Sequence, residues 1–160
     1  MNIADRFSIV KNAAEPITDT LSTFFAPFGV KVEFGTDFSY YPDEELITYA
    51  LLISDEDGLA FKNFAEKIFP EICSPVFIWS LFHELGHHMT VDDFEEEDWK
   101  NYNSLVASHL DRDSYFHLPI ELMATCWAGA YMKTHADKVT NLVADLNIAI
   151  DTFNANLKNA

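Results

Sequence analysis

The sequence predicts an α+β protein that is mostly helical and contains a short antiparallel sheet. Apolar residues recur at helical spacing over most of the chain, whereas only two short segments show the pattern of a strand. The chain has 160 residues, of which 49% are hydrophobic, so it is long enough to bury a core. No repeat, low-complexity tract or long linker divides it, and we expect a single domain over residues 1–160.

The N-terminal third predicts an interrupted helix followed by two strands. Residues 3–28 have a helical apolar period, and Pro16 should kink or split this element because proline lacks a backbone N–H. Apolar and charged residues alternate over residues 30–34, which predicts a half-buried strand. After an aromatic-rich loop at 35–43, residues 45–53 predict a second strand, antiparallel to the first.

Two helices are expected in the next part of the chain. A charged turn at residues 54–58 precedes the first of them, over residues 59–69, where aromatic and aliphatic residues share one side. The second is expected over residues 74–90. Ser74 followed by Pro75 predicts an N-cap with proline at the first helical position, and apolar residues recur at helical spacing after it.

Three more helices follow an acidic segment. Asp93 with Glu96 is typical of a capping box, here for a helix that runs to about residue 110. Pro119 begins the next helix, over residues 119–133, and the last is expected over residues 137–158. The buried face of the first of these three is expected to contain Trp99, Tyr102, Leu105, Val106 and Leu110.

The helix predicted over residues 74–90 contains the sequence His-Glu-x-x-His. Because residues four apart lie on one helical face, His83 and His87 can direct two imidazoles at one point. Imidazole nitrogen is a good Zn²⁺ ligand, at about 2.0–2.1 Å. Glu84 lies one step round the helix, where a carboxylate can take a proton from water without being a ligand. These residues predict a catalytic zinc site.

Two histidines leave such a site one protein ligand short. Glu121 is the first candidate, because it lies in the first turn of a helix whose next residues on the same face are small. Those small residues would allow close packing against Gly86, which is otherwise unfavourable inside a helix. Asp93 is the alternative. The remaining candidates are Asp92, His88, His109 and His117.

The motif and the later glutamate resemble a known family. The run 83–87 (HELGH) followed by 121–124 (ELMA) is similar to the gluzincin-type zinc metallopeptidases, which have a third glutamate ligand on the next core helix. The small size and the order of elements most resemble the ImmA/IrrE-like metallopeptidases of bacteria and phages. That family often has aspartate where this chain has Thr125, so no carboxylate partner for a ligand histidine is expected there.

The resemblance implies a zincin-like fold and an intracellular zinc peptidase that acts on a peptide or a regulatory protein. Zn²⁺ would be held by His83, His87 and Glu121, with Glu84 as the general base. An extended substrate would lie along the strand at residues 45–53. By sequence order alone, Tyr115 and His117 are candidates for a donor that stabilises the transition state. The alternative is a zinc-binding domain without turnover that serves as an interaction module.

The net charge of −16 bears on the partners of this protein. Nucleic acid and anionic membrane surfaces are disfavoured, because both require a basic protein surface. Two cysteines do not indicate a disulfide framework, and neither a signal peptide nor an apolar run of membrane-spanning length is visible. We therefore expect a cytoplasmic location. The sequence does not indicate an oligomeric state.

Overall fold

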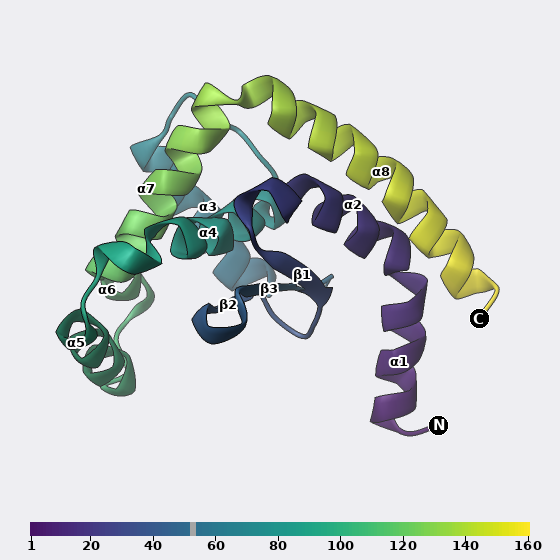
Figure 1. Cartoon of the computed structure of the whole chain (residues 1–160), viewed down its shortest axis with the longest axis horizontal. Helices are drawn as coiled ribbons and strands as arrows, with labels where there is room; N and C mark the ends of the chain where they lie inside the picture. The colour runs from purple at the N-terminus through teal and green to yellow at the C-terminus, as the bar shows by residue number, and fades with distance from the viewer. Residues whose placement is uncertain (52–53) are drawn as a thin grey trace. The chain divides into compact units, whose positions relative to one another are not determined.

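The computed structural model describes residues 1–51 and 54–160, which form two compact units. The first, called the terminal unit below, contains Met1–Leu51 and Ala136–Ala160. The second, called the central unit, is Leu52–His135. Helices dominate both units, and a small sheet lies in the terminal unit, so the predicted α+β class with mostly helical content is confirmed (Figure 1). A single domain over residues 1–160 stays a prediction.

Three helices form most of the terminal unit. The predicted break near Pro16 is confirmed. One residue, Ala14, separates α1 (Ile3–Ala13) from α2 (Glu15–Phe25), and the proline lies in the first turn of α2. The last helix, α8 (Ala136–Lys158), runs alongside α2 (Figure 1). The core side of α2 carries side chains that are fully buried, namely Ile17, Leu21 and Phe25.

The sheet is mixed, and the prediction of an antiparallel sheet is wrong. Strand β1 (Lys31–Phe34) pairs in parallel with β3 (Leu46–Tyr49), and β2 (Ser39–Tyr41) pairs antiparallel with β3. The reason is that the expected aromatic loop contains β2. The chain reverses after β2 through a short 3-10 turn, Pro42–Glu44, and returns as β3 in the direction of β1.

The position of β3 corrects a second prediction. The strand order is β1-β3-β2, so β3 is the central strand and its main chain pairs on both sides. A strand with two neighbours has no free edge to which an extended peptide can add. The expected substrate edge along residues 45–53 is therefore wrong for the part that the structure describes, and residues 52 and 53 lie outside the described residues.

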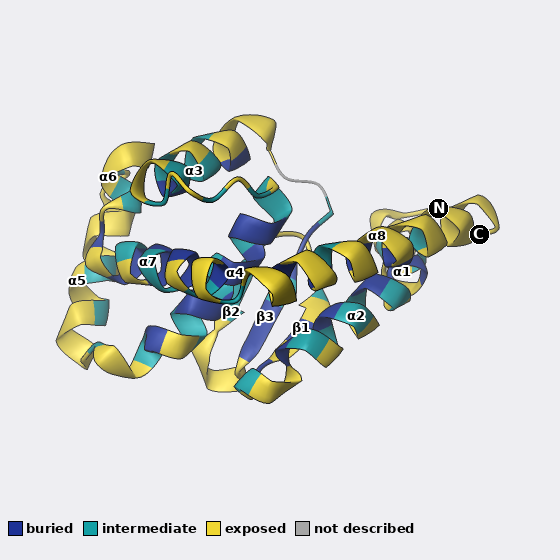
Figure 2. Cartoon of the chain, turned by 90° about the horizontal axis from the view of Figure 1, so that it is seen from above, coloured by how far each residue is buried: buried dark blue, intermediate teal, exposed yellow. Residues whose placement is uncertain are grey.

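The central unit is built around two long helices that pack closely. These are α4 (Val76–Thr90) and α7 (Pro119–Thr134). A Cβ placed on Gly86 would lie 2.3 Å from the carbonyl oxygen of Ala124, which is shorter than any real contact. The glycine therefore allows the two backbones to approach, as the small residues on α7 predict. Figure 2 shows buried residues, in dark blue, along both helices.

Three shorter helices complete the central unit: α3 (Asp55–Ile68), α5 (Glu96–Ala107) and α6 (Arg112–Phe116). The charged segment 54–58 is the first turn of α3 rather than a turn before it, because acidic residues also suit a helix N-terminus. Pro75, rather than Ser74, is the N-cap of α4.

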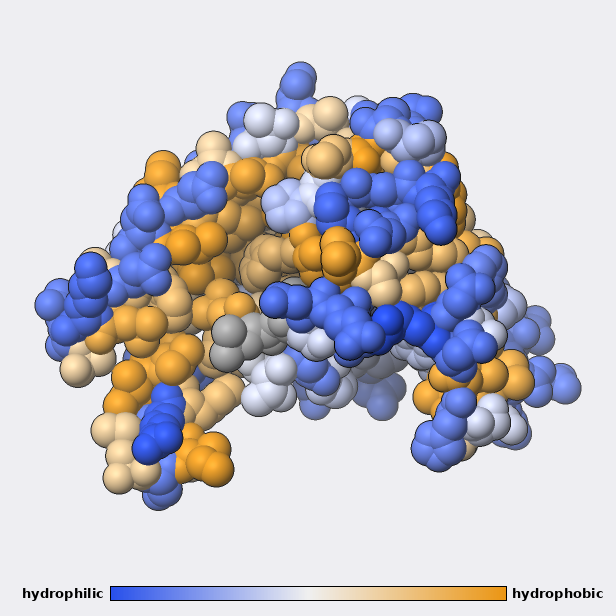
Figure 3. Space-filling model, turned by 180° about the vertical axis from the view of Figure 1, so that it is seen from behind, coloured by the Kyte–Doolittle hydropathy of each residue, from blue (hydrophilic) through white to orange (hydrophobic). Residues whose placement is uncertain are grey.

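The start and the buried face of α5 differ from the prediction. The capping box is formed by Glu95 and Asp98, whereas Asp93 belongs to a preceding 3-10 turn, Val91–Asp93. No residue of α5 is buried, and Leu105 and Val106 are 44% and 39% exposed (Figure 2). Figure 3 shows hydrophobic and hydrophilic surface side by side on the lobe where α5 lies, at lower right.

Candidate metal centre

Three side chains from two helices converge in the central unit. His83 and His87 lie one turn apart on α4, and their ring centroids are 4.6 Å apart. Glu121, in the first turn of α7, is only 3% exposed. Its Oε1 lies 2.8 Å from His83 Nε2 and 3.0 Å from His87 Nε2. Among the described residues, these three form the group that could hold a metal ion, with ligand atoms within 4.8 Å of one another.

The packing of α4 against its neighbours sets the position of each ligand. The contact between Gly86, directly before His87, and Ala124, one turn after Glu121, brings α4 and α7 together, and the buried face of α7 continues beyond Ala124. On the other side, the ring of Phe61 on α3 meets the imidazole of His83 edge-on, with centroids 5.0 Å apart. The two histidine side chains are each 12% exposed, so the site is nearly closed to water.

Thr125 determines which nitrogen of His83 carries the proton. Its Oγ1 donates to the carbonyl oxygen of Glu121 at 3.2 Å and lies 3.0 Å from His83 Nδ1. Because the hydroxyl proton is used on the carbonyl, Oγ1 accepts from the Nδ1–H of His83. The lone pair of Nε2 is then directed at the carboxylate. A hydroxyl on α7 thus orients a ligand histidine of α4 from outside the ligand group, a role that the sequence pattern did not indicate.

The donor set of this site suits a divalent cation. With Nδ1 protonated, His83 Nε2 is an electron-pair donor that faces Oε1 of Glu121, another electron-pair donor, at 2.8 Å. Two such atoms at this separation are stabilised by a cation between them, whether a proton or a metal. Nitrogen and carboxylate oxygen are the ligands that zinc takes in catalytic sites. The residues present therefore fit the metal that the motif predicts.

When a proton rather than a metal occupies the space between the ring nitrogens and the carboxylate, the histidines and Glu121 stabilise one another's charges. Burial would raise the pKa of Glu121, but the hydrogen bonds and positive charge of the two histidines hold this pKa far below its usual value. Burial would lower the pKa of His87, yet the hydrogen bond and the negative charge of Glu121, together with the charge of Glu84, raise it. The carboxylate is therefore ionised, which is the form that binds a cation.

The second oxygen of Glu121 accepts two hydrogen bonds. Tyr102 on α5 donates its hydroxyl to Oε2 at 2.6 Å, and Tyr115 on α6 donates at 2.9 Å. Burial and the negative charge of Glu121 raise the pKa of both tyrosines, so both hydroxyls stay protonated as donors. The helical period predicts Tyr102 only as part of a buried helix face. The available signal was that a buried tyrosine needs a partner for its hydroxyl.

Glu84 lies close to the ligand group without belonging to it. It is half-buried on α4, and its negative charge raises the pKa of both His87 and Tyr115.

The other candidates do not join the group. Asp92 and Asp93 are exposed in the 3-10 turn after α4, and His88 is half-buried but absent from the ligand group. His109 is exposed and has a positive φ of 58°. His117, at the end of α6, is exposed; its Nδ1 lies 2.8 Å from the carbonyl oxygen of Asp113.

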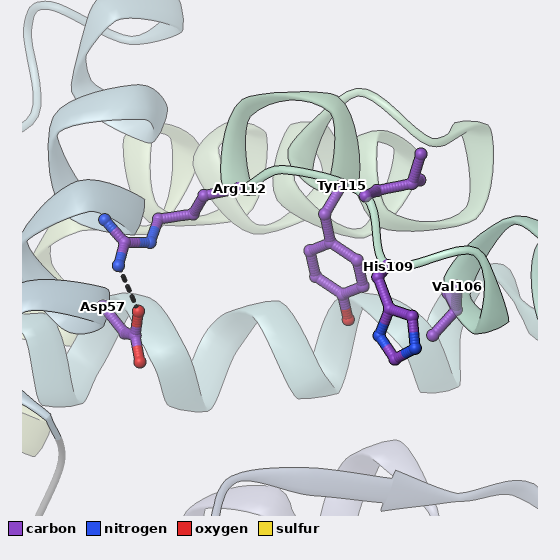
Figure 4. Close-up of a pocket in the computed structure, with 6 residues that line it drawn as sticks. Asp57, Val106, His109, Arg112 and Tyr115 are labelled. Carbon is purple, nitrogen blue, oxygen red and sulfur yellow. Dashed lines mark ion pairs between the residues drawn. The ribbon is translucent and has the colours of Figure 1, made fainter.

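A cavity of about 570 Å³ opens beside the site. Tyr115 lines it, so the side chain that bonds Glu121 also forms part of the cavity wall. At one end, Arg112 on α6 pairs with Asp57 on α3 at 2.6 Å, and His109 and Val106 lie at the other end (Figure 4). The cavity is therefore connected to the site through Tyr115, which contacts the ligand carboxylate.

Comparisons with known proteins do not identify a family for this chain. No protein-family model, curated protein or solved structure matches the chain. No helix within the described residues has the length and apolar character needed to cross a membrane. The function is therefore inferred from the arrangement of the side chains themselves.

Proposed function

We propose that this protein is a zinc-dependent metallopeptidase that hydrolyses peptide bonds. The observation that supports the proposal most is the convergence of His83 Nε2 and His87 Nε2 on Glu121 Oε1, each within hydrogen-bonding distance of that oxygen. Two imidazoles and one carboxylate are a ligand set of catalytic zinc sites, which leave a position open for water or substrate. When bound, zinc would supply Lewis acidity, which polarises a carbonyl and makes water more acidic.

The protein's own residues have distinct roles in this proposal. Glu84 would accept the proton of the attacking water and deliver it to the leaving amine. Thr125 would keep His83 in the tautomer whose Nε2 is a ligand. The low exposure of the histidines would exclude bulk water and strengthen every charge interaction in the site.

A peptide is the substrate that the surroundings of the site support best. The cavity lined by Tyr115 would receive one side chain of the substrate. The net charge of −16 would favour the approach of a basic peptide over an acidic one. A regulatory protein is the physiological target that the family resemblance suggests.

Metal analysis and cleavage assays test the proposal together. Purified wild-type protein should contain one zinc ion per chain, and anomalous scattering should place it at Glu121. On a mixture of unstructured peptides, Glu84→Gln should retain zinc and lose about 10²- to 10⁴-fold in cleavage rate. Glu97→Gln, an exposed change on α5, is the matched control and should cleave at the wild-type rate.

The same experiment separates the enzyme from a zinc-binding interaction module. A module would bind zinc and show no cleavage in the wild type. Equal cleavage by wild type and Glu84→Gln would remove Glu84 from the mechanism. A wild-type protein without bound metal would exclude both functions.

A further inference from the structure

Glu121 shares its two carboxylate oxygens between two different sets of partners. Oε1 faces the Nε2 atoms of His83 and His87, whereas Oε2 accepts from Tyr102 and Tyr115. The two tyrosines come from α5 and α6, and their hydroxyl oxygens lie 3.4 Å apart. Side chains of α4, α5 and α6 therefore meet at one carboxylate of α7.

The tyrosines occupy the acceptor capacity of Oε2. A carboxylate oxygen has about two lone-pair sites, and two hydroxyl donors at 2.6 and 2.9 Å use both. Only Oε1 is then left to bind a cation.

We propose that Tyr102 and Tyr115 are positioning residues that make Glu121 a ligand through one oxygen. This inference rests on the metal centre of the proposed function. A carboxylate that binds through both oxygens would occupy the position that a catalytic site keeps open for water or substrate. Holding Oε2 away from the metal therefore preserves the open position and sets the angle at which Oε1 approaches.

The environment of Tyr102 supports a role for its hydroxyl beyond packing. No residue of α5 is buried, so this helix contributes little to the core. Its half-buried Tyr102 nevertheless reaches Oε2 at 2.6 Å, the shorter of the two hydroxyl contacts. A phenylalanine would make the same ring contacts, so the hydroxyl is the part that the carboxylate requires.

Cobalt-substituted protein tests the inference without any cleavage assay. Four-coordinate Co²⁺ absorbs visible light more strongly than five- or six-coordinate Co²⁺. In Tyr102→Phe/Tyr115→Phe, Glu121 should bind through both oxygens, so the absorption should fall, and X-ray absorption of the zinc form should show one more oxygen neighbour. Metal affinity should fall by about 10- to 100-fold, as for other changes to groups that orient metal ligands.

Each single variant should retain one hydroxyl on Oε2 and show a smaller loss of affinity. Tyr131→Phe is the matched control, because it removes a hydroxyl from the same helix as Glu121 but outside the site, and it should resemble the wild type. If the double variant does not fold, Tyr102→Phe alone decides the question by its Co²⁺ spectrum and affinity.

The outcomes distinguish this inference from the proposed function. Metal binding by the wild type, with an unchanged spectrum and affinity in the double variant, would overturn the positioning role and leave the metal centre intact. For a double variant that does not fold, an unchanged spectrum and affinity in Tyr102→Phe would have the same meaning. Failure of the wild type to bind Co²⁺ or Zn²⁺ would overturn the proposed function itself.

Discussion

Thr125 Oγ1 lies 3.0 Å from His83 Nδ1, and this contact joins the two helices that form the metal centre. The hydroxyl accepts from the imidazole because its own proton is donated to the carbonyl oxygen of Glu121. A residue in the interior of α7 therefore controls the tautomer of a ligand on α4. This acceptor favours the tautomer of His83 that presents its Nε2 lone pair.

Replacement of the hydroxyl should weaken metal binding. Thr125→Val keeps the shape of the side chain but removes the acceptor for His83 Nδ1–H, so zinc affinity should fall by about 10- to 100-fold. Competition with a chelator of known affinity measures this change. Thr125→Ser retains a hydroxyl and should stay near the wild-type affinity. Equal affinities for the valine and serine variants would contradict the role of the hydroxyl.

A methyl group at Gly86 should disrupt the contact between α4 and α7. The added Cβ would lie 2.3 Å from the backbone oxygen of Ala124, and backbone atoms cannot turn aside as a side chain does. Gly86→Ala should therefore lower the free energy of unfolding by about 1–3 kcal/mol, despite the better helix propensity of alanine. Thermal unfolding measures the effect. Met89→Ala, at an exposed position of the same helix, should change it by less than about 0.5 kcal/mol.

The central unit should become less stable in acid, partly because the carboxylate of Glu66 is protonated there. Burial alone would raise its pKa, but hydrogen bonds from Lys62, Trp79 Nε1 and the Ser74 N–H, with the charge of Lys62, lower it below the usual 4.5. A lowered folded-state pKa means that the ionised carboxylate stabilises the fold. This contribution is complete above pH 4.5 and is lost as the pH falls through the lowered value.

Unfolding measured between pH 7 and pH 3 tests this prediction. Wild type should be more stable than Glu66→Gln at pH 7, and the difference should shrink as the pH decreases below 4.5. A difference that is constant across this range would show that the charge of Glu66 does not contribute. The hydrogen bonds of Glu66 join two helices, α3 and the start of α4. Circular dichroism reports the loss of helix and is therefore a suitable probe of this unfolding.

Removal of metal should destabilise the wild type and leave a ligand variant unchanged. A ligand present at ~100 times its dissociation constant adds about 2.7 kcal/mol to the free energy of unfolding. A chelator should therefore lower the melting temperature of the wild type. It should have no effect on Glu121→Ala, in which the carboxylate is missing. An equal shift in both proteins would place the stabilising metal elsewhere.

The sequence predicted the parts of the site that depend on local spacing. His83 and His87 are four residues apart on one helix, and Glu121 follows a proline that begins the next long helix, so periodicity and capping were sufficient. Tyr102 and Thr125 were missed as parts of the site. Their partners lie 19 and 42 residues away in the chain, and no local pattern identifies a hydroxyl that meets such a distant group.

The errors in the fold have a similar origin. β2 has only three residues, too few for a clear alternation, and the direction of β3 depends on the pairing of that strand. The apolar residues of α5 have a helical period, yet Leu105 and Val106 remain exposed. A period shows that one side of a helix is apolar, but it does not show that another element covers it.

The hydrogen bonds to the carboxylate of Glu121 also affect which substitutions the sequence can tolerate during evolution. Most side chains of α5 face water, so their identities can drift at little cost. Tyr102 is different, because its hydroxyl is bound to the same carboxylate that meets both imidazoles. In a gene under selection for the site, this codon should accept fewer replacements than the codons of the exposed residues of the same helix.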